Sequence, residues 1–177
     1  MRIDSIAKKT YREALSAIRE VLGVQVQECE LFIVEKRELP QIKPSLGERP
    51  HIMNFLRGFY EAEWNTIFVV SGYEDDFQTI LHEALHSNSC LHPSNSPFWI
   101  REGLTETLTE HVLLRKGLSY SGNLLLKEEL NFWSGMFKKH REKIIEAYFS
   151  KNLKKCYTIL AEVTGISHLE KKAFTEI

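Results

Sequence analysis

The sequence predicts an α+β protein with a small twisted sheet in an N-terminal lobe, a mostly helical C-terminal lobe and a cleft between them. Strand and helix patterns are mixed before residue 72, whereas nearly every later segment has helical spacing. The length of 177 residues suits one domain, or one domain built from two small lobes. We therefore expect a single domain over residues 1–177, with an α/β lobe over 1–90 and a helical lobe over 91–177.

The N-terminal half alternates between the two periodicities. Apolar residues at helical spacing predict a first helix, and Gly23 marks its end. Runs of β-branched residues predict strands, and the clearest of them ends at Gly72 and directly precedes the next helix. Asp75 or Asp76 is expected to cap that helix. The expected elements, in order, are a helix at 4–22, a strand at 24–35, a loop at 40–50, a strand at 51–60, a strand at 65–71 and a helix ending near residue 87.

The C-terminal half is helical almost throughout. A polar loop rich in serine and proline separates it from the preceding helix. The first helix of this half is expected to end near Gly117. The expected helices lie at 99–114, 124–140, 143–149, 153–163 and 166–174.

Composition excludes several classes of function. The formal net charge is −1, so there is no overall electrostatic argument for binding nucleic acid or an anionic membrane. The longest apolar runs are far too short to span a bilayer, and the N-terminus shows no apolar signal core. Three cysteines without a C-x-x-C spacing favour a reduced setting. We expect a cytoplasmic protein whose partner is a peptide or protein substrate.

The most informative motif lies in the segment 79–86. His82 and His86 stand four residues apart, and Glu83 directly follows the first histidine. In a helix the two imidazoles share a face and can reach one metal ion. Glu83 lies about 100° further round, where its carboxylate can deprotonate a metal-bound water. This H-E-x-x-H spacing is typical of zinc metallopeptidases.

The competing interpretation of the same segment is an amphipathic helix without a metal. Leu81, Ala84 and Leu85 would then face the core, and the two histidines would be solvated. That interpretation would make the protein a helical interaction domain, and the H-E-x-x-H match would be accidental.

A third ligand is expected from the start of the next helix. A catalytic zinc site uses three protein ligands and keeps one position open. Glu102 is the candidate, because a helix-loop-helix return can bring it back to the two histidines. Gly103 is expected to let its backbone pack closely beside the metal-site helix. Glu106 lies on the same face and could accept the N–H of a ligating histidine; for Glu110 a solvated position is preferred.

The segments His82-Glu83-x-x-His86 and Trp99-x-x-Glu102-Gly103 resemble the gluzincin metallopeptidases. That group includes thermolysin-like enzymes, the W-L-x-E-G aminopeptidases and small single-domain minigluzincins. The resemblance covers roughly residues 58–110. It implies one zinc ion per chain and a hydrolase that cleaves peptide bonds. The implied roles are zinc ligands for His82, His86 and Glu102, general base for Glu83 and a supporting acidic position for Glu106.

The resemblance also implies where substrate binds. The stretch from Gly58 to Val70 is similar to the family's edge strand, which precedes the metal-site helix and binds substrate by strand addition. Substrate is expected to lie extended along residues 66–71. A tyrosine, histidine or arginine of the helical lobe usually assists at the carbonyl oxygen. Tyr157 and His168 lie at the more suitable distances downstream, while Tyr120, His140 and Tyr148 are further candidates.

Other arrangements of the same residues stay open. His92 follows His86 at the spacing of the metzincin pattern, although that pattern has a glycine where this chain has Ser89. Residues 134–136 resemble a Met-turn but fall within a predicted helix. A non-catalytic zinc- or peptide-binding module of the same fold is a further alternative. A latent enzyme, with residues 151–177 covering the cleft, is another.

Overall fold

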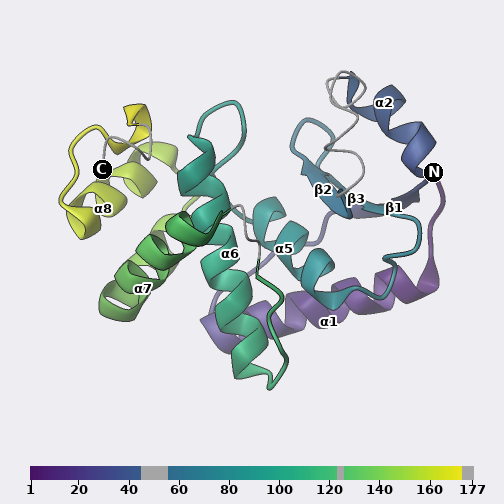
Figure 1. Ribbon diagram of the computed structural model, residues 1–177, viewed down its shortest axis with the longest axis horizontal. Coiled ribbons are helices and arrows are strands. Elements are labelled where there is room, and N and C mark those ends of the chain that lie inside the picture. The colour runs from purple at the N-terminus through teal and green to yellow at the C-terminus, as the bar shows by residue number, and fades with distance from the viewer. Residues whose placement is uncertain (45–55, 123–125, 173–177) are drawn as a thin grey trace. The chain divides into compact units, whose positions relative to one another are not determined.

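The structure is a computed structural model (Figure 1). The residues that it describes are 1–44, 56–122 and 126–172. The chain divides into two units, one formed by residues 1–19 with 25–87 and the other by residues 20–24 with 88–177. A small sheet lies in the first unit and long helices make up the second, which confirms the predicted α+β class.

The sheet of the first unit has three strands in the order β1-β3-β2. Their bounds are Glu30–Val34 for β1, Gly58–Glu61 for β2 and Thr66–Val70 for β3. β3 pairs parallel with β1 and antiparallel with β2, so it is the central strand. The expectation that residues 66–71 form a substrate-binding edge is therefore wrong, because β3 already has a partner on each side.

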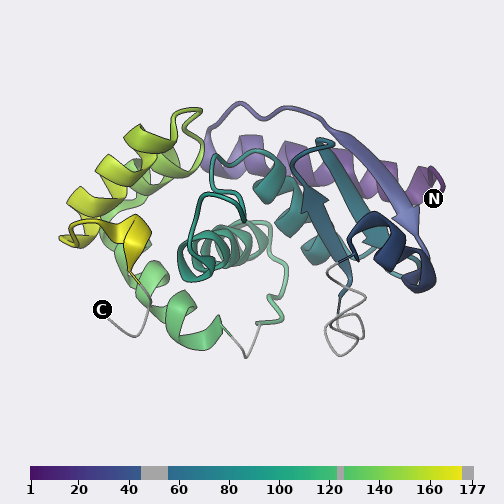
Figure 2. The ribbon, with the colours of Figure 1, turned by 90° about the horizontal axis from the view of Figure 1, so that it is seen from above.

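Alternation along the strands gives the sheet two apolar faces. Phe59, Phe68 and Val70 point to one face, where they pack with Leu39 of the short helix α2 (Leu39–Ile42). On the other face lie α1 (Ser5–Leu22) and α5 (Phe77–Ser87) (Figures 1 and 2). This second layer positions the predicted metal-site helix against the sheet.

The ends of α1 follow the expected local chemistry. The Asp4 carboxylate accepts the backbone N–H groups of Ile6 at 2.8 Å and Ala7 at 3.1 Å, which satisfies donors of the first turn. Gly23 follows the last residue with φ 70°, a left-handed conformation that glycine adopts without strain. The helix predicted at 4–22 is thus confirmed.

The second unit is built from α6 (Phe98–Arg115), α7 (Lys127–Tyr148) and α8 (Leu153–Thr164). α7 packs against both other helices. Trp133 and Tyr148 of α7 are among the largest fully buried side chains of the described residues. No helix in the described ranges is long and apolar enough to cross a membrane.

Five predicted elements differ from the structure. Residues 24–29 are not a strand, because the partner β3 is only five residues long and pairs with residues 30–34. Pro40 lies in the first turn of α2 rather than in a loop, a position where proline costs no hydrogen bond. The helices predicted at 124–140 and 143–149 are merged into α7 with a kink at His140. The last predicted helix is reduced to the 3₁₀ turn η3 (Leu169–Lys171).

Other predictions fall partly outside the described residues. Of the strand predicted at 51–60, residues 58–60 are in β2, while residues 51–55 are not described. The same holds for residues 45–50 of the predicted loop, 124–125 before α7 and 173–174 near the C-terminal end.

Candidate metal centre

The local sequence fixes where α5 begins. The Asp76 carboxylate accepts the Thr79 backbone N–H at 3.1 Å and the Thr79 hydroxyl at 2.9 Å, as an N-terminal cap does. The Arg57 Nη1 forms an ion pair with the Asp76 Oδ2 at 3.2 Å. Leu81, Ala84 and Leu85 are fully buried, as predicted for the apolar side of the helix.

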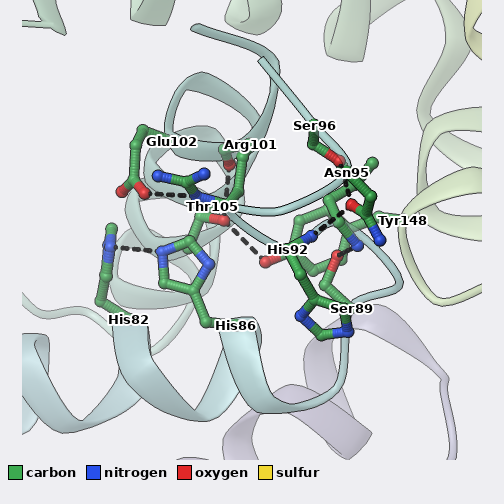
Figure 3. Close-up of polar contacts among 11 residues, drawn as sticks. His82, His86, Ser89, His92, Asn95, Ser96, Arg101, Glu102, Thr105 and Tyr148 are labelled. Atoms are coloured by element: carbon green, nitrogen blue, oxygen red, sulfur yellow. Dashed lines mark hydrogen bonds and ion pairs between the residues drawn. The ribbon is translucent and has the colours of Figure 1, made fainter. Parts of the chain in front are cut away.

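His82 and His86 face each other from successive turns of α5 (Figure 3). Their Nε2 atoms are 3.0 Å apart, and their rings meet edge to face with centroids 4.7 Å apart. His86 is 8% exposed, so the histidines are not the solvated pair of the amphipathic-helix interpretation. Two nitrogen ligands of one tetrahedral zinc ion lie about 3.3 Å apart. The spacing of the imidazoles therefore fits a shared metal ion.

Glu83 is buried on α5, close to the start of the edge strand β2. Only 7% of the surface of Glu83 is exposed. A Cβ atom added to Gly58 would lie 3.4 Å from the Glu83 Cγ and 3.1 Å from the Thr79 Cγ2. The absence of a side chain at Gly58 thus lets the strand run close beside the turn of α5 that carries Glu83.

The glutamates of the predicted site lie on α6, in the second unit. Arg101 donates from Nε to the Glu102 Oε1 at 2.8 Å (Figure 3), and both side chains are mostly buried. Glu106 is buried one turn later, and the Tyr120 hydroxyl donates to its Oε2 at 2.8 Å. The structure thus places His82, Glu83 and His86 together on one helix, and Glu102 and Glu106 together on another.

Gly103 lies close to side chains of α7. The nearest neighbours of a Cβ atom at this position would be Trp133, with Cδ1 at 2.5 Å, and Glu129, with Cβ at 3.2 Å. Both belong to α7, so the missing side chain at Gly103 permits close packing of α6 against α7. Trp99 supports the same contact, because its ring stacks on Trp133 at 5.6 Å and its carbonyl accepts the Trp133 indole N–H at 3.1 Å.

The candidates for assisting at the carbonyl oxygen have different surroundings. The Tyr157 hydroxyl donates to the Asn95 carbonyl at 3.1 Å, and burial raises the pKa of this tyrosine. The Tyr148 hydroxyl is buried and bonded to Thr105 at 2.7 Å. His168 is exposed, with 76% of its side chain accessible. The Tyr120 hydroxyl contacts Glu106, an acidic residue of the predicted site.

The features that suggested a metzincin pattern lie in ordinary secondary structure. α5 ends at Ser87, and the backbone N–H of His92 in the following loop donates to the Asn95 Oδ1 at 2.8 Å. Residues 134–136 lie within α7, so they form no Met-turn.

Arg101 is a residue that the sequence analysis did not single out. The signal was present, because Arg101 directly precedes Glu102 in the chain. Adjacent residues on a helix point about 100° apart, so spacing alone gave no reason to expect an ion pair between them.

Comparisons with known proteins match no family model, no curated protein and no solved structure to this chain.

Proposed function

We propose that this protein is a zinc-dependent peptidase. The observation that carries the proposal is the pair of His82 and His86 Nε2 atoms, 3.0 Å apart, with the buried Glu83 carboxylate on the same helix. Histidine is the commonest metal ligand in proteins, and a neutral imidazole pair at this spacing suits a divalent ion. The resemblance of the H-E-x-x-H and W-x-x-E-G segments to gluzincins supports the same conclusion.

Glu102 is the proposed third ligand. The carboxylate lies at the position that the gluzincin-like motif assigns to it, in the second turn of α6. The three side chains offer one ligand atom each, an imidazole nitrogen from His82 and from His86 and a carboxylate oxygen from Glu102. Two imidazoles and one carboxylate are a donor set typical of catalytic zinc sites, which leave the fourth position open.

The metal ion and the protein side chains would have separate roles in peptide hydrolysis. A bound zinc ion would supply Lewis acidity, which polarises a carbonyl oxygen and makes water more acidic. Glu83 would accept a proton from the attacking water and deliver it to the nitrogen of the leaving amine. Glu106, held by Tyr120, would support the ligand set on α6. This proton transfer requires the carboxylate of Glu83, and an amide cannot perform it.

The edge strand β2 is the proposed site for the substrate backbone. Within the described residues, no strand pairs with β2 on the side away from β3. The Val70 N–H donates to the Arg57 carbonyl, so the alternating antiparallel pattern directs the backbone groups of Gly58 and Tyr60 away from β3. An extended peptide added to this edge would lie beside Gly58, where Glu83 approaches the strand.

The test of the proposal separates metal binding from turnover. Elemental analysis of the purified protein should find about one zinc per chain, and a library of peptides should be cleaved. Glu83→Gln should abolish cleavage while the zinc content stays that of the wild type. Glu110→Gln on α6 is the matched control, and it should retain both cleavage and zinc.

Two further variants test the third ligand. Glu102→Ala should lower the zinc content, and His92→Ala should not. The reverse result would favour the metzincin alternative. A wild-type protein that binds zinc but cleaves no peptide would instead support a non-catalytic module, and a protein without zinc would overturn the proposal.

A further inference from the structure

Arg101 has an unusual environment for a charged residue on a helix. Its guanidinium lies against the Glu102 carboxylate, with Nε donating to Oε1 at 2.8 Å (Figure 3). The Phe98 ring lies 5.7 Å from the guanidinium carbon, and the Arg101 side chain is only 13% exposed. Packing on Phe98 and the bond to Glu102 together restrict the plane of the guanidinium.

Most of the donors of this guanidinium are not used by the protein. Arginine carries five N–H donors, and in the described part of the chain the one side-chain hydrogen bond of Arg101 is that from Nε. The side chain of Arg101 keeps 13% of its surface exposed. Its two terminal nitrogens are not among the buried side-chain atoms of the described residues that lack a hydrogen-bond partner. A planar pair of N–H donors in this arrangement matches the two oxygens of a carboxylate.

The charge balance at Arg101 depends on Glu102. A mostly buried guanidinium is stable only beside a compensating anion, because arginine keeps its proton. Glu102 supplies that anion here, yet the proposed function also requires Glu102 as a metal ligand. With a divalent cation sharing the carboxylate, the positive charge of Arg101 would lose much of its compensation. A second anion, brought by the substrate, would restore the balance.

We propose that Arg101 binds a carboxylate of the substrate and so determines which peptides are cleaved. The inference rests on the proposed function, and it names the substrate class: peptides with a carboxylate close to the scissile bond. That carboxylate is either an acidic side chain or the C-terminus of the peptide. Arg101 thereby selects substrate and has no part in proton transfer.

The first experiment compares cleavage of matched peptides. A glutamate beside the scissile bond is exchanged for glutamine, and each peptide is prepared with a free or an amidated C-terminus. The wild type should cleave one carboxylate-bearing form with a kcat/KM at least about tenfold above its neutral partner. Which of the two exchanges changes the rate identifies the source of the carboxylate.

Substitutions then assign the preference to Arg101. In Arg101→Gln the ratio of kcat/KM between the charged and neutral peptides should fall to about one, chiefly through KM. Arg101→Lys keeps the charge but loses the planar fork, so it should retain part of the preference. Arg115→Gln, at the other end of α6, is the matched control and should keep the wild-type ratio.

A binding measurement provides a readout independent of turnover. In a Glu83→Gln background, calorimetry should give tighter binding of the charged peptide, and adding Arg101→Gln should remove the difference. Equal cleavage of charged and neutral peptides by the wild type would overturn the inference alone, as would a preference that survives Arg101→Gln. Failure of a zinc-loaded wild type to cleave any peptide would instead overturn the proposed function, and the inference with it.

Discussion

Helices α5 and α6 both bury polar side chains, but they satisfy them in different ways. On α6 the hydroxyls of Thr105, Thr107 and Thr109 each donate at 2.8 Å to a carbonyl four residues earlier in the same helix. On α5 the buried His86 faces the partly buried His82, and their Nε2 atoms lie 3.0 Å apart. A threonine hydroxyl can be satisfied by its own helix, whereas an Nε2 atom at the end of an imidazole ring cannot reach its own helix in this way. The buried threonines are thus satisfied within their own helix, whereas the two Nε2 atoms contact each other at a spacing that one metal ion could bridge.

The largest expected effect tests this difference directly. Zinc at a hundredfold excess over its Kd should raise the free energy of unfolding by about 2.7 kcal/mol, because the ion binds the native state. His86→Ala should abolish this stabilisation. Thr109→Val removes a buried hydroxyl of α6 and should leave it intact. Thermal unfolding with zinc and with a chelator measures all three proteins.

Two outcomes would contradict this difference between the helices. The first is zinc stabilisation of His86→Ala equal to that of the wild type, which would mean that the facing imidazoles hold no metal. The second is loss of stabilisation in Thr109→Val, which would mean that general damage to the fold explains the loss. For each variant, the free energy of unfolding measured with chelator is the reference from which its stabilisation by zinc is calculated.

The sequence predicts α5 well because its signals are local. Asp76 caps the helix, apolar residues face the sheet, and the histidines fall one turn apart by the geometry of any α-helix. The α+β class, α1 and α8 follow from periodicity in the same way. These features depend on residues a few positions apart, which is the range that spacing can report.

The order of the strands could not be predicted by spacing. β3 has the strongest strand pattern, with all five residues buried, and that pattern reflects its central position between two partners. An edge strand should instead have been sought in Gly58–Glu61, whose burial decreases along its length. Which strand lies at the edge depends on pairing between distant segments, which the residue pattern within one strand does not report.

The neighbour of Gly103 also lies beyond the range of local spacing. Glycine beside a candidate ligand indicates close packing, but the sequence does not name the neighbour. That neighbour is Trp133, thirty residues later in α7, stacked on Trp99. The W-x-x-E-G segment thus combines two residues that pack α6 against α7 with one that carries the candidate ligand.

An intermediate effect is expected from closing the space at Gly103. Gly103→Ala would place Cβ 2.5 Å from the Cδ1 of Trp133, which is fully buried and hydrogen-bonded to Trp99. Overpacking of this kind costs about 1–3 kcal/mol. Gly135→Ala in α7 is the matched control, because a Cβ atom there meets nothing within 4 Å. That control should gain about 0.5–1 kcal/mol from helix propensity.

Urea unfolding of the two alanine variants gives the measurement. The same glycine-to-alanine change is expected to lower the free energy of unfolding in α6 and to raise it in α7. Equal effects of Gly103→Ala and Gly135→Ala would contradict the close packing of α6 against Trp133.

The smallest effect concerns His111, the exception among the buried polar groups of α6. Its Nε2 is buried without a hydrogen-bond partner in the described residues, and its ring meets Phe137 at 5.0 Å. Burial, and secondarily the charges of Arg141 and Arg115, hold the pKa of His111 below its usual value. Here α6 leaves a ring nitrogen unsatisfied, with cations and an aromatic ring around it in place of a ligand.

The sign of the pH dependence follows from that shift. Because the folded pKa lies below the unfolded value of about 6.5, the unfolded state binds a proton first as the pH falls. The contribution of His111 to stability is therefore complete above about pH 6.5 and is lost as the pH falls through the folded pKa. His111→Phe cannot titrate, so its free energy of unfolding should decline less steeply with acid than that of the wild type. Chelator in both samples removes any contribution from zinc release. If the free energy of unfolding fell equally steeply with acid in both proteins, α6 would tolerate a charged His111, and this residue would not differ from the other buried polar groups of the helix.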